Sequence, residues 1–394
     1  MNILKLFLLS FTLIFMNCKE KQTKLCNIEE FTELGSPNNI VKAGVSAPFV
    51  GILENHLIVA GGCNFPDKPL TEGGQKEYSN QIWALNLNNK NATWNIVGEL
   101  PLPLAYGASV TTPESLIFLG GNNNNASTAN VYSIKFNSSK DSILVENLTP
   151  LPFALDNFAA TYSNNKIYVI GGNKEGKPNN DFYCGELLDS TINWKKLNEY
   201  TGACKIQPTL LAINNNGEDV IYLSGGFLPG DNNNPPQIPT NILKYSPKSN
   251  AWSAETTLPL LPDKNLRSLI GSSAVSYQNR YLIYFGGVNY NCFYEAVDRP
   301  RQIFLAEQEG NSELVESLKA EGAKYLHYPQ EWYKFNTEVI CYDIITKQWS
   351  LLANTNLASR AGAGAAIIDN RMFIVCGELK PGVRTPIISS LRLF

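Results

Sequence analysis

Six short aliphatic runs constrain the fold of this 394-residue chain more than any other feature. Five of them end in a glycine pair, and the spacing between successive pairs is 51 to 61 residues. The pairs begin at Gly61, Gly120, Gly171, Gly225 and Gly286. Periods of this length, made of β-branched and aromatic runs with turns between them, are typical of β-propeller blades. The sixth run, from Phe373 to Val375, ends instead in Cys376 and Gly377.

Aromatic residues recur behind the glycines. Tyr245 precedes Trp252 by seven residues, and Tyr342 precedes Trp349 by the same spacing, while Trp94 and Trp194 take comparable places in the first and third repeats. Paired glycines followed by tyrosine and tryptophan resemble the kelch repeat, in which one repeat forms one four-stranded blade. Glycine suits a crowded strand end, and the aromatic rings fill the wedge between blades. We therefore expect an all-β, six-bladed kelch-type β-propeller.

The two ends of the chain are expected to share a blade. The segment 391–394 at the C-terminus supplies only a third strand to the last blade, whereas residues 28–34 form an unassigned strand at the other end. Pairing of the two would complete the sixth blade and close the ring, which removes the open edges of a linear stack.

The fifth repeat contains an insertion at about residues 290–335, because Gly287 and Gly377 lie 90 residues apart. Residues 312–320 have helical periodicity, with an N-cap candidate at Asn311 or Ser312. The insertion should rise on the face where the glycine pairs end. Two interpretations are open: a helical lid over the channel mouth, or a helix packed on the side of the propeller.

The N-terminus has the pattern of an export signal. An uncharged stretch from Leu6 to Met16 follows Lys5 and is too short to cross a bilayer. Cys18 follows directly, which predicts a signal peptide at 1–17, lipidation of Cys18, a tether at 18–25 and the propeller at 26–394. Plain secretion is the alternative. We expect a periplasmic or cell-envelope protein whose contact with the membrane is limited to this anchor.

Charge and metal-ligand content exclude several classes of function. The net charge of −3 and the lack of a basic cluster argue against nucleic acid as a partner. The chain has two histidines and no Cys-x-x-Cys pair, so a metal site, including the copper site of a galactose-oxidase-type propeller, is not expected. Eight cysteines allow disulfides in an exported protein, but their pairing is not predictable.

We call each aliphatic run with its terminal glycines a glycine signal. The sixth signal, whose glycine pair is broken, carries the candidate catalytic group. Loops after the six signals should share one face, and Glu378 is the sole carboxylate among the residues that directly follow them. A carboxylate beside a channel is partly desolvated, which favours acid–base chemistry. Arg384 lies six residues later, across a Lys380-Pro381-Gly382 turn that brings the two arms together. By spacing alone, Glu378 and Arg384 are more often a structural ion pair.

The segment 376–385, Cys-Gly-Glu-Leu-Lys-Pro-Gly-Val-Arg-Thr, resembles the Gly-Glu-x-Lys-Pro-Gly-x-Arg-Thr motif of the N-acetylneuraminate epimerases, or sialic acid mutarotases. The resemblance covers residues 221–385, and residues 49–79 match a part that follows the motif in those enzymes. The chain thus resembles a cyclically permuted branch of that family. The resemblance implies a cofactor-independent isomerase that interconverts the α and β anomers of N-acetylneuraminic acid. It implies Glu378 as acid–base group and Arg384 as anchor of the sugar carboxylate.

Four further residues are candidates for substrate binding. Arg267 and Arg360 precede first strands of blades and should lie on the same face, although a structural role is equally open for both. Asn289 and Tyr290 follow the fifth glycine pair and could reach the pocket. A non-catalytic glycan- or protein-binding propeller, or a mutarotase for another acidic or N-acetylated sugar, are the alternative functions.

Overall fold

The computed structural model describes residues 26, 28–34, 39–89, 91–137, 139, 142–215 and 217–394. The expected signal peptide, tether and lipidated Cys18 lie outside these residues. The described chain is all-β apart from two long helices and a few short ones, as the sequence predicts. No helix in the described ranges is long and apolar enough to cross a membrane.

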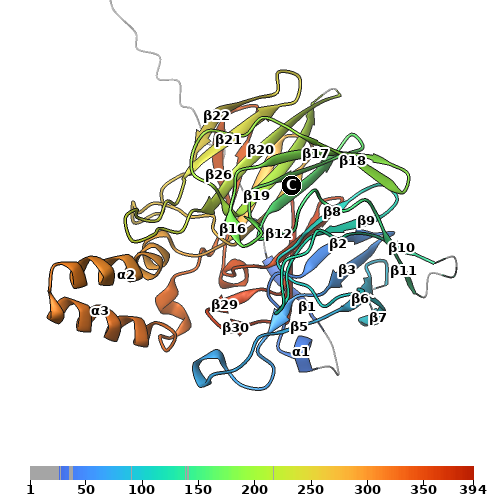
Figure 1. Ribbon diagram of the computed structural model, residues 1–394. Helices are drawn as coiled ribbons and strands as arrows, with labels where there is room; N and C mark the ends of the chain where they lie inside the picture. Colours follow the sequence, from blue (N-terminus) through green and yellow to red (C-terminus); the bar gives the residue numbers. More distant parts are fainter. Residues whose placement is uncertain are drawn as a thin grey trace, which may run out of the picture.

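Six four-stranded antiparallel sheets make up most of the described chain (Figure 1). In each of the first five sheets the strands pair in chain order. The first sheet is β2 (Phe49–Leu53), β3 (His56–Ala60), β6 (Gln81–Asn86) and β7 (Asn95–Glu99). The second is β8 (Ala108–Thr111), β9 (Leu116–Leu119), β10 (Val131–Phe136) and β11 (Ile143–Asn147). The third is β13 (Ala159–Ser163), β14 (Lys166–Ile170), β17 (Phe182–Leu188) and β18 (Thr191–Lys196).

The remaining sheets follow the same plan. The fourth is β19 (Ile206–Asn215), β20 (Glu218–Phe227), β21 (Asn241–Ser246) and β22 (Ala251–Thr257). The fifth is β23 (Ser272–Tyr277), β24 (Tyr281–Gly286), β25 (Glu338–Asp343) and β26 (Gln348–Asn354). The sixth is β27 (Gly364–Ile368), β28 (Arg371–Val375), β31 (Ile387–Arg392) and β1 (Ile28–Glu33).

Successive sheets pack face to face through apolar clusters. Residues of the first and second sheets form one buried cluster, and each following pair of sheets forms the next, through to a cluster between the sixth and first. The first strand of each sheet contacts the first strand of the sheet on either side, so β2 contacts both β8 and β27. The tryptophans help to join sheets. The indole N–H of Trp252 donates to the carbonyl of Asn198, just after the third sheet, and that of Trp349 donates to the carbonyl of Thr257 in the fourth.

The N-terminal strand pairs where the sequence places it. β1 runs antiparallel to β31, with Ile28 opposite Leu391 and Glu33 opposite Ile387. Phe31 packs its ring 5.3 Å from that of Phe373 in β28. The outer strand of the sixth sheet therefore comes from the opposite end of the chain to its other three strands.

Each glycine pair lies where one sheet meets the next. Gly286 has φ +66°, and a Cβ there would lie 2.2 Å from the carbonyl oxygen of Arg360. The amide of Gly287 donates to that same carbonyl at 2.7 Å. At the sixth signal, Cys376 takes the left-handed conformation with φ 55°, and Gly377 donates to the carbonyl of Val45 at 2.9 Å. The glycine signals are therefore contacts between neighbouring sheets.

Substituting alanine for Gly286 should destabilise the protein strongly. Gly176 is a matched control, because it has φ +80° but no heavy atom within 4 Å of an added Cβ. Gly176→Ala should cost only the left-handed strain, about 1–2 kcal/mol. Gly286→Ala should cost about 1–3 kcal/mol more, since the Arg360 backbone must move. Urea unfolding measures both, and equal losses would contradict the crowding argument.

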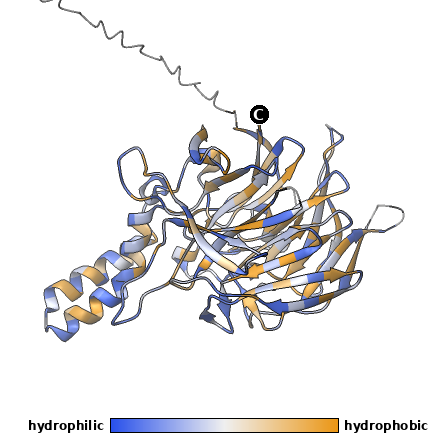
Figure 2. Cartoon of the chain, turned by 90° about the horizontal axis from the view of Figure 1, so that it is seen from above, coloured by the Kyte–Doolittle hydropathy of each residue, from blue (hydrophilic) through white to orange (hydrophobic). Residues whose placement is uncertain are grey.

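The insertion forms two helices, α2 (Tyr290–Gln308) and α3 (Ser312–Tyr325). The sequence predicts only the second, and Asn311 caps it as expected, accepting from the amide of Leu314 at 3.1 Å. The two helices form a hairpin that projects away from the sheets (Figures 1 and 2). The hairpin thus stands beside the sheets, and only its base approaches them.

Candidate active site

One cavity of about 320 Å³ is lined by residues at or just before the first strands of all six sheets. Its volume is in the range of small-molecule sites. Two kinds of segment line it: the residues just before each first strand, and the residues after the fifth and sixth glycine signals. The sequence predicts this common face. Of the residues that directly follow the six signals, Val288 and Glu378 line the cavity, whereas Cys63, Asn122, Asn173 and Phe227 do not.

A repeated left-handed position stands near the start of every first strand. The six residues have φ between 51° and 64°: Ala47, Tyr106, Asn157, Gln207, Gly271 and Gly362. Five backbone hydrogen bonds link them in order, such as Asn157 N–H to the Tyr106 carbonyl at 2.8 Å and Ala47 N–H to the Gly362 carbonyl at 2.7 Å. All six residues line the cavity. The side chains that this position carries into the cavity therefore decide much of its chemistry.

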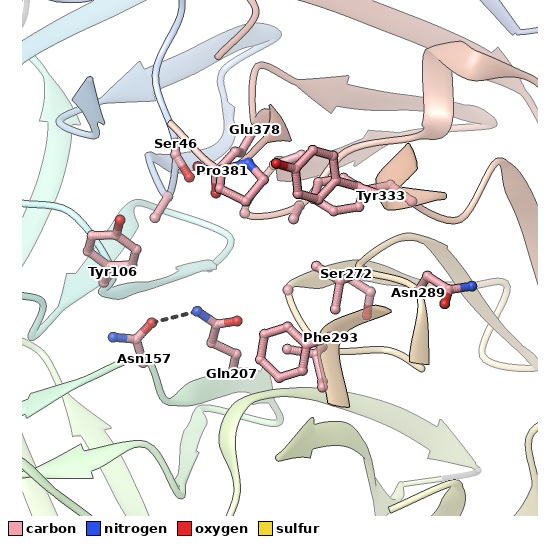
Figure 3. Close-up of a pocket in the computed structure, with 18 of the residues that line it drawn as sticks. Ser46, Tyr106, Asn157, Gln207, Ser272, Asn289, Phe293, Tyr333, Glu378 and Pro381 are labelled. Atoms are coloured by element: carbon pink, nitrogen blue, oxygen red, sulfur yellow. Dashed lines mark hydrogen bonds between the residues drawn. The ribbon is translucent and has the colours of Figure 1, made fainter. Parts of the chain in front are cut away.

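Glu378 occupies one side of this cavity (Figure 3). It begins β29 (Glu378–Lys380), which pairs with β30 (Val383–Arg384) so that Glu378 lies opposite Arg384. Its Oε1 accepts a hydrogen bond from the amide of Gly382 at 2.7 Å. Its Oε2 accepts none from any residue that the structure describes, and the side chain is 23% exposed. One carboxylate oxygen is thus held and the other is free for chemistry.

The hairpin that carries Glu378 is fixed on both sides. Lys380 donates its Nζ to the carbonyl of Tyr328 at 2.6 Å, which ties the turn to the end of the insertion. Gly382 has φ +83°, and a Cβ there would lie 2.7 Å from that of Leu70. The Lys-Pro-Gly turn is therefore clamped between the insertion and the loop after β4 (Cys63–Asn64). The position of Glu378 depends on both contacts.

Arg384 lies behind Glu378 and does not line the cavity. Its Nη1 is 2.9 Å from Oε1 of Glu378, and its side chain is only 3% exposed. The pair is not aligned as a hydrogen bond, and Nε and Nη1 donate to no residue in the described part of the chain. The guanidinium carbon lies 4.9 Å from the ring centre of Phe65. The structure thus contains the ion pair that spacing alone favours, with donor capacity left on the arginine.

The other titratable groups of the cavity stay neutral near pH 7. Burial raises the pKa of Tyr325 to about 12 and holds the pKa of Tyr106 well above its usual range. Burial also raises the pKa of the Cys292 thiol and of Tyr333. Among the described residues that line the cavity, Glu378 is the sole carboxylate. It is therefore the group best suited to remove a proton from a bound molecule.

Arg267 and Arg360 make structural contacts away from the cavity. Arg267 is 4% exposed, pairs with Glu338 and donates to the carbonyl of Pro259. Arg360 is 2% exposed and donates to the carbonyl of Cys376 and to Ser389 of β31. Burial lowers its pKa to about 10. Neither lines the cavity, which supports the structural alternative for both.

Asn289 lines the cavity, whereas its neighbour Tyr290 does not. Asn289 caps α2, accepting at Oδ1 from the amides of Asn291 and Cys292, both at 3.1 Å. The ring of Tyr290 stacks on Tyr294 at 6.3 Å. Of the four weaker candidates, the structure thus places only Asn289 beside Glu378's cavity.

Several lining residues were not predicted from the sequence. They are polar or aromatic side chains at or just before the first strands of five sheets and in the insertion: Ser46, Tyr106, Asn157, Gln207, Ser272, Phe293 and Tyr333. A signal for three of them exists, because Tyr106, Asn157 and Gln207 occupy the repeated left-handed position. Aligning the repeats just ahead of each first strand would have found them.

A family model described as N-acetylneuraminate epimerase matches residues 16–143 and 149–393. Curated relatives include N-acetylneuraminate epimerases of Haemophilus influenzae strain 86-028NP, 28% identical over 238 residues, and of Vibrio cholerae El Tor Inaba N16961, 28% identical over 237. Each alignment covers 60% of this chain and 56% of the relative. The relative from Salmonella typhimurium LT2 is 24% identical over 241 residues, with 61% and 57% covered. The chain thus spans a little over half the length of these relatives.

A solved structure entitled "Structure of YjhT" is also similar. It is 22% identical, with a TM-score of 0.48, and the match covers 59% of this chain and 60% of that one.

Proposed function

Since the chain belongs to the N-acetylneuraminate epimerase family, we propose that it interconverts the α and β anomers of N-acetylneuraminic acid. One observation carries the proposal. Glu378 is the sole carboxylate among the described residues that line the cavity, and its Oε2 accepts no hydrogen bond from a described residue. Mutarotation needs a proton removed and returned, with no net oxidation, and one carboxyl group can do both.

The proposed reaction has four steps. Glu378 Oε2 takes the proton of the anomeric hydroxyl, and the bond from the anomeric carbon to the ring oxygen breaks as the carbonyl forms. The proton returns to the ring oxygen, which becomes a hydroxyl. The carbonyl then rotates, and the same hydroxyl closes the ring on its other face with the proton transfers reversed. Bonds and protons balance over the cycle, and we propose that no cofactor takes part.

We propose that Arg384 holds the carboxylate of Glu378 in place and also binds the carboxylate of the sugar. Its charge lies 2.9 Å from Oε1, which holds the carboxylate in place. Its Nε has no hydrogen bond to described residues, and the edge of the guanidinium formed by Nε and Nη2 can hold a sugar carboxylate by two parallel hydrogen bonds. This anchoring requires the sugar to reach a side chain that is 3% exposed, so it involves movement of Glu378 or Phe65.

We also propose that the six sheets are blades of a closed kelch propeller. The apolar cluster between the sixth and first sheets and the pairing of β1 with β31 support it. The resemblance of residues 49–79 to a part that follows the motif in family members supports cyclic permutation, which a closed ring tolerates because its termini can lie in any loop. Export, with lipidation at Cys18, is proposed from the N-terminal pattern alone.

The proposed function predicts faster equilibration of anomers. A sialidase releases α-N-acetylneuraminate, and NMR then follows the growth of the β anomer with and without the protein. We expect the protein to raise this rate in proportion to its concentration. A rate equal to the uncatalysed one would refute the mutarotase. Binding without acceleration would favour the non-catalytic glycan-binding alternative, and acceleration of another acidic sugar alone would reassign the substrate.

A further inference from the structure

The loop between β4 and β5 (Glu77–Tyr78) borders both the hairpin of Glu378 and the cavity. It clamps the Lys-Pro-Gly turn of that hairpin through Leu70. The last residue of the loop, Lys76, places its Nζ 3.3 Å from the hydroxyl oxygen of Tyr106, which lines the cavity. Lys76 directly precedes β5, whose pairing with β4 fixes the backbone from which this side chain starts. The loop therefore brings a cation to the edge of the cavity.

Lys76 has no opposite charge beside it among the described residues. Its Nζ donates to no described residue other than Tyr106, and it lies 5.1 Å from the centre of the same ring. An ammonium group has three donors and no acceptor, so two N–H groups remain. The side chain is half-buried and is not itself part of the cavity lining, which it meets through Tyr106. Lys76 thus keeps its charge and most of its hydrogen-bonding capacity for a ligand.

The contact with Lys76 also fixes the hydrogen-bond polarity of Tyr106. Because an ammonium group only donates, the phenol oxygen accepts from Lys76 and its own O–H is left to donate. Burial above all holds the pKa of Tyr106 well above its usual range, so this proton is present near pH 7. In Figure 3 the hydroxyl points toward the side of the cavity on which Ser46 and Glu378 lie. Two donors, one of them charged, therefore stand 3.3 Å apart on that side.

Lys76 and Arg384 are cations of the same region. Both act on the buried thiol of Cys63, whose sulfur lies 3.4 Å from the Tyr106 hydroxyl oxygen. Burial raises the pKa of this thiol, and the charge of Glu378 adds to the rise, whereas the charges of Arg384 and Lys76 lower it. The three charges thus surround one thiol beside the cavity.

The balance of charge in the site requires a further cation when an acidic sugar binds. Glu378 and Arg384 offset each other in their ion pair. The carboxylate of the sugar is attached to the same carbon as the hydroxyl that Glu378 is proposed to deprotonate, so two negative charges come close together and repel. Lys380, the other cation of the hairpin, is bound to the carbonyl of Tyr328 at 2.6 Å. Lys76 is therefore the cation that can offset the second negative charge.

We propose that Lys76 and the hydroxyl of Tyr106 form a second anchor for the carboxylate of the sugar. The phenol O–H donates to one carboxylate oxygen, and the ammonium group donates to the same oxygen or to its neighbour. The flexible four-carbon stem of lysine lets Nζ follow the bound group. A carboxylate has lone pairs for several donors, so this anchor adds to the one at Arg384. The inference rests on the proposed function and adds to it the residues that set a preference for an acidic sugar.

The test measures the preference for a charged sugar rather than activity alone. NMR gives kcat/KM for anomer equilibration of N-acetylneuraminate and of its uncharged methyl ester, each dissolved as a single anomer. Each value is divided by the uncatalysed rate of the same sugar, so the intrinsic reactivities cancel. Wild type should prefer the acid by about tenfold or more, the effect expected for hydrogen bonds to a charged group.

Two variants remove the proposed contacts. Lys76→Met keeps the length and the packing on the Tyr106 ring but removes the charge, and Tyr106→Phe keeps the ring but removes the hydroxyl. Each should lower the acid-to-ester ratio about tenfold. In Lys76→Met the loss should raise KM for the acid more than it lowers kcat, because the anchor holds the sugar before and during the reaction. Lys76→Arg retains the charge and should keep most of the preference.

Two matched controls accompany these variants. Lys68→Met removes the same charge from an exposed position in the same loop, and Tyr162→Phe removes a hydroxyl in β13, outside the cavity lining. Both should keep the wild-type ratio. Thermal unfolding of every variant shows whether a loss on both sugars reflects unfolding.

The outcomes separate the anchor from the activity. A folded Lys76→Met variant with the wild-type ratio overturns the anchor and leaves the mutarotase standing, as does equal acceleration of acid and ester by wild type. An equal fall in Lys68→Met overturns direct contact in favour of attraction at long range. An unchanged ratio in Tyr106→Phe overturns the share of the hydroxyl. Acceleration of neither sugar by wild type overturns the mutarotase and the anchor with it.

Discussion

Glu378→Gln should reduce the catalysed equilibration of N-acetylneuraminate anomers by about 10²- to 10⁴-fold, the usual contribution of a general acid–base group. Glutamine has the same shape and can still accept from the Gly382 amide, a bond now 2.7 Å long. It cannot take the anomeric proton. The same NMR measurement gives the rate. The loss should lower kcat more than it changes KM, because Glu378 transfers the proton in the transition state.

The matched control is Glu309→Gln, at the end of α2 and exposed to solvent. It should leave the rate unchanged. Because Glu378→Gln leaves the buried Arg384 without its ion-pair partner, thermal unfolding must show that the variant is folded. A folded variant with the wild-type rate would refute the role of Glu378, even if the protein remains a mutarotase.

Removal of the N-terminal strand should abolish cooperative folding. A chain that begins at residue 37 lacks β1, and the edge of β31 loses its antiparallel partner. It also loses Leu34, which is 2% exposed and belongs to the apolar cluster between the sixth and first sheets, and Phe31, which packs against that cluster. We expect the lost strand pairing and buried apolar area to exceed the typical net stability of a domain, about 5–15 kcal/mol, because folding of the proposed ring depends on its closure.

Circular dichroism during heating and urea titration measure the effect. The control chain begins at Leu25, which removes the expected signal peptide and most of the tether but keeps β1. The control should unfold in one cooperative transition, and the shorter chain should show none. A shorter chain that melts like the control would contradict ring closure by β1.

Local repetition explains what the sequence predicted well. The six glycine signals predict strand ends. The glycines lie where an added Cβ would clash with the neighbouring sheet or the segment before it, as at Gly286. The Lys-Pro-Gly turn predicts a hairpin, and Glu378 lies opposite Arg384 in it. These features depend on residues close in sequence, so pattern and turn chemistry are sufficient to find them.

The sequence left alternatives open where the partners of a residue are distant in sequence. Arg267 meets Glu338, 71 residues later, and the candidate lid helix is one arm of a hairpin that projects beside the sheets. The same limit hid Gln207, whose amide is oriented through Asn157, 50 residues earlier. No periodicity encodes such contacts.

The sequence by itself determined the repeated strands and the hairpin with Glu378, because each follows from local periodicity and turn-forming residues. It also determined the shared last sheet, because the last repeat lacks one strand and the N-terminus has one to spare. Only the tertiary structure decided which side chains meet around the cavity. It placed Gln207, Asn289 and Phe293 around one cavity, although they come from a first strand and from the start of a helix. It also paired Arg267 with Glu338 and bonded Arg360 to the carbonyl of Cys376, away from the cavity. The physical reason is that burial and hydrogen-bond polarity are set by neighbours in space.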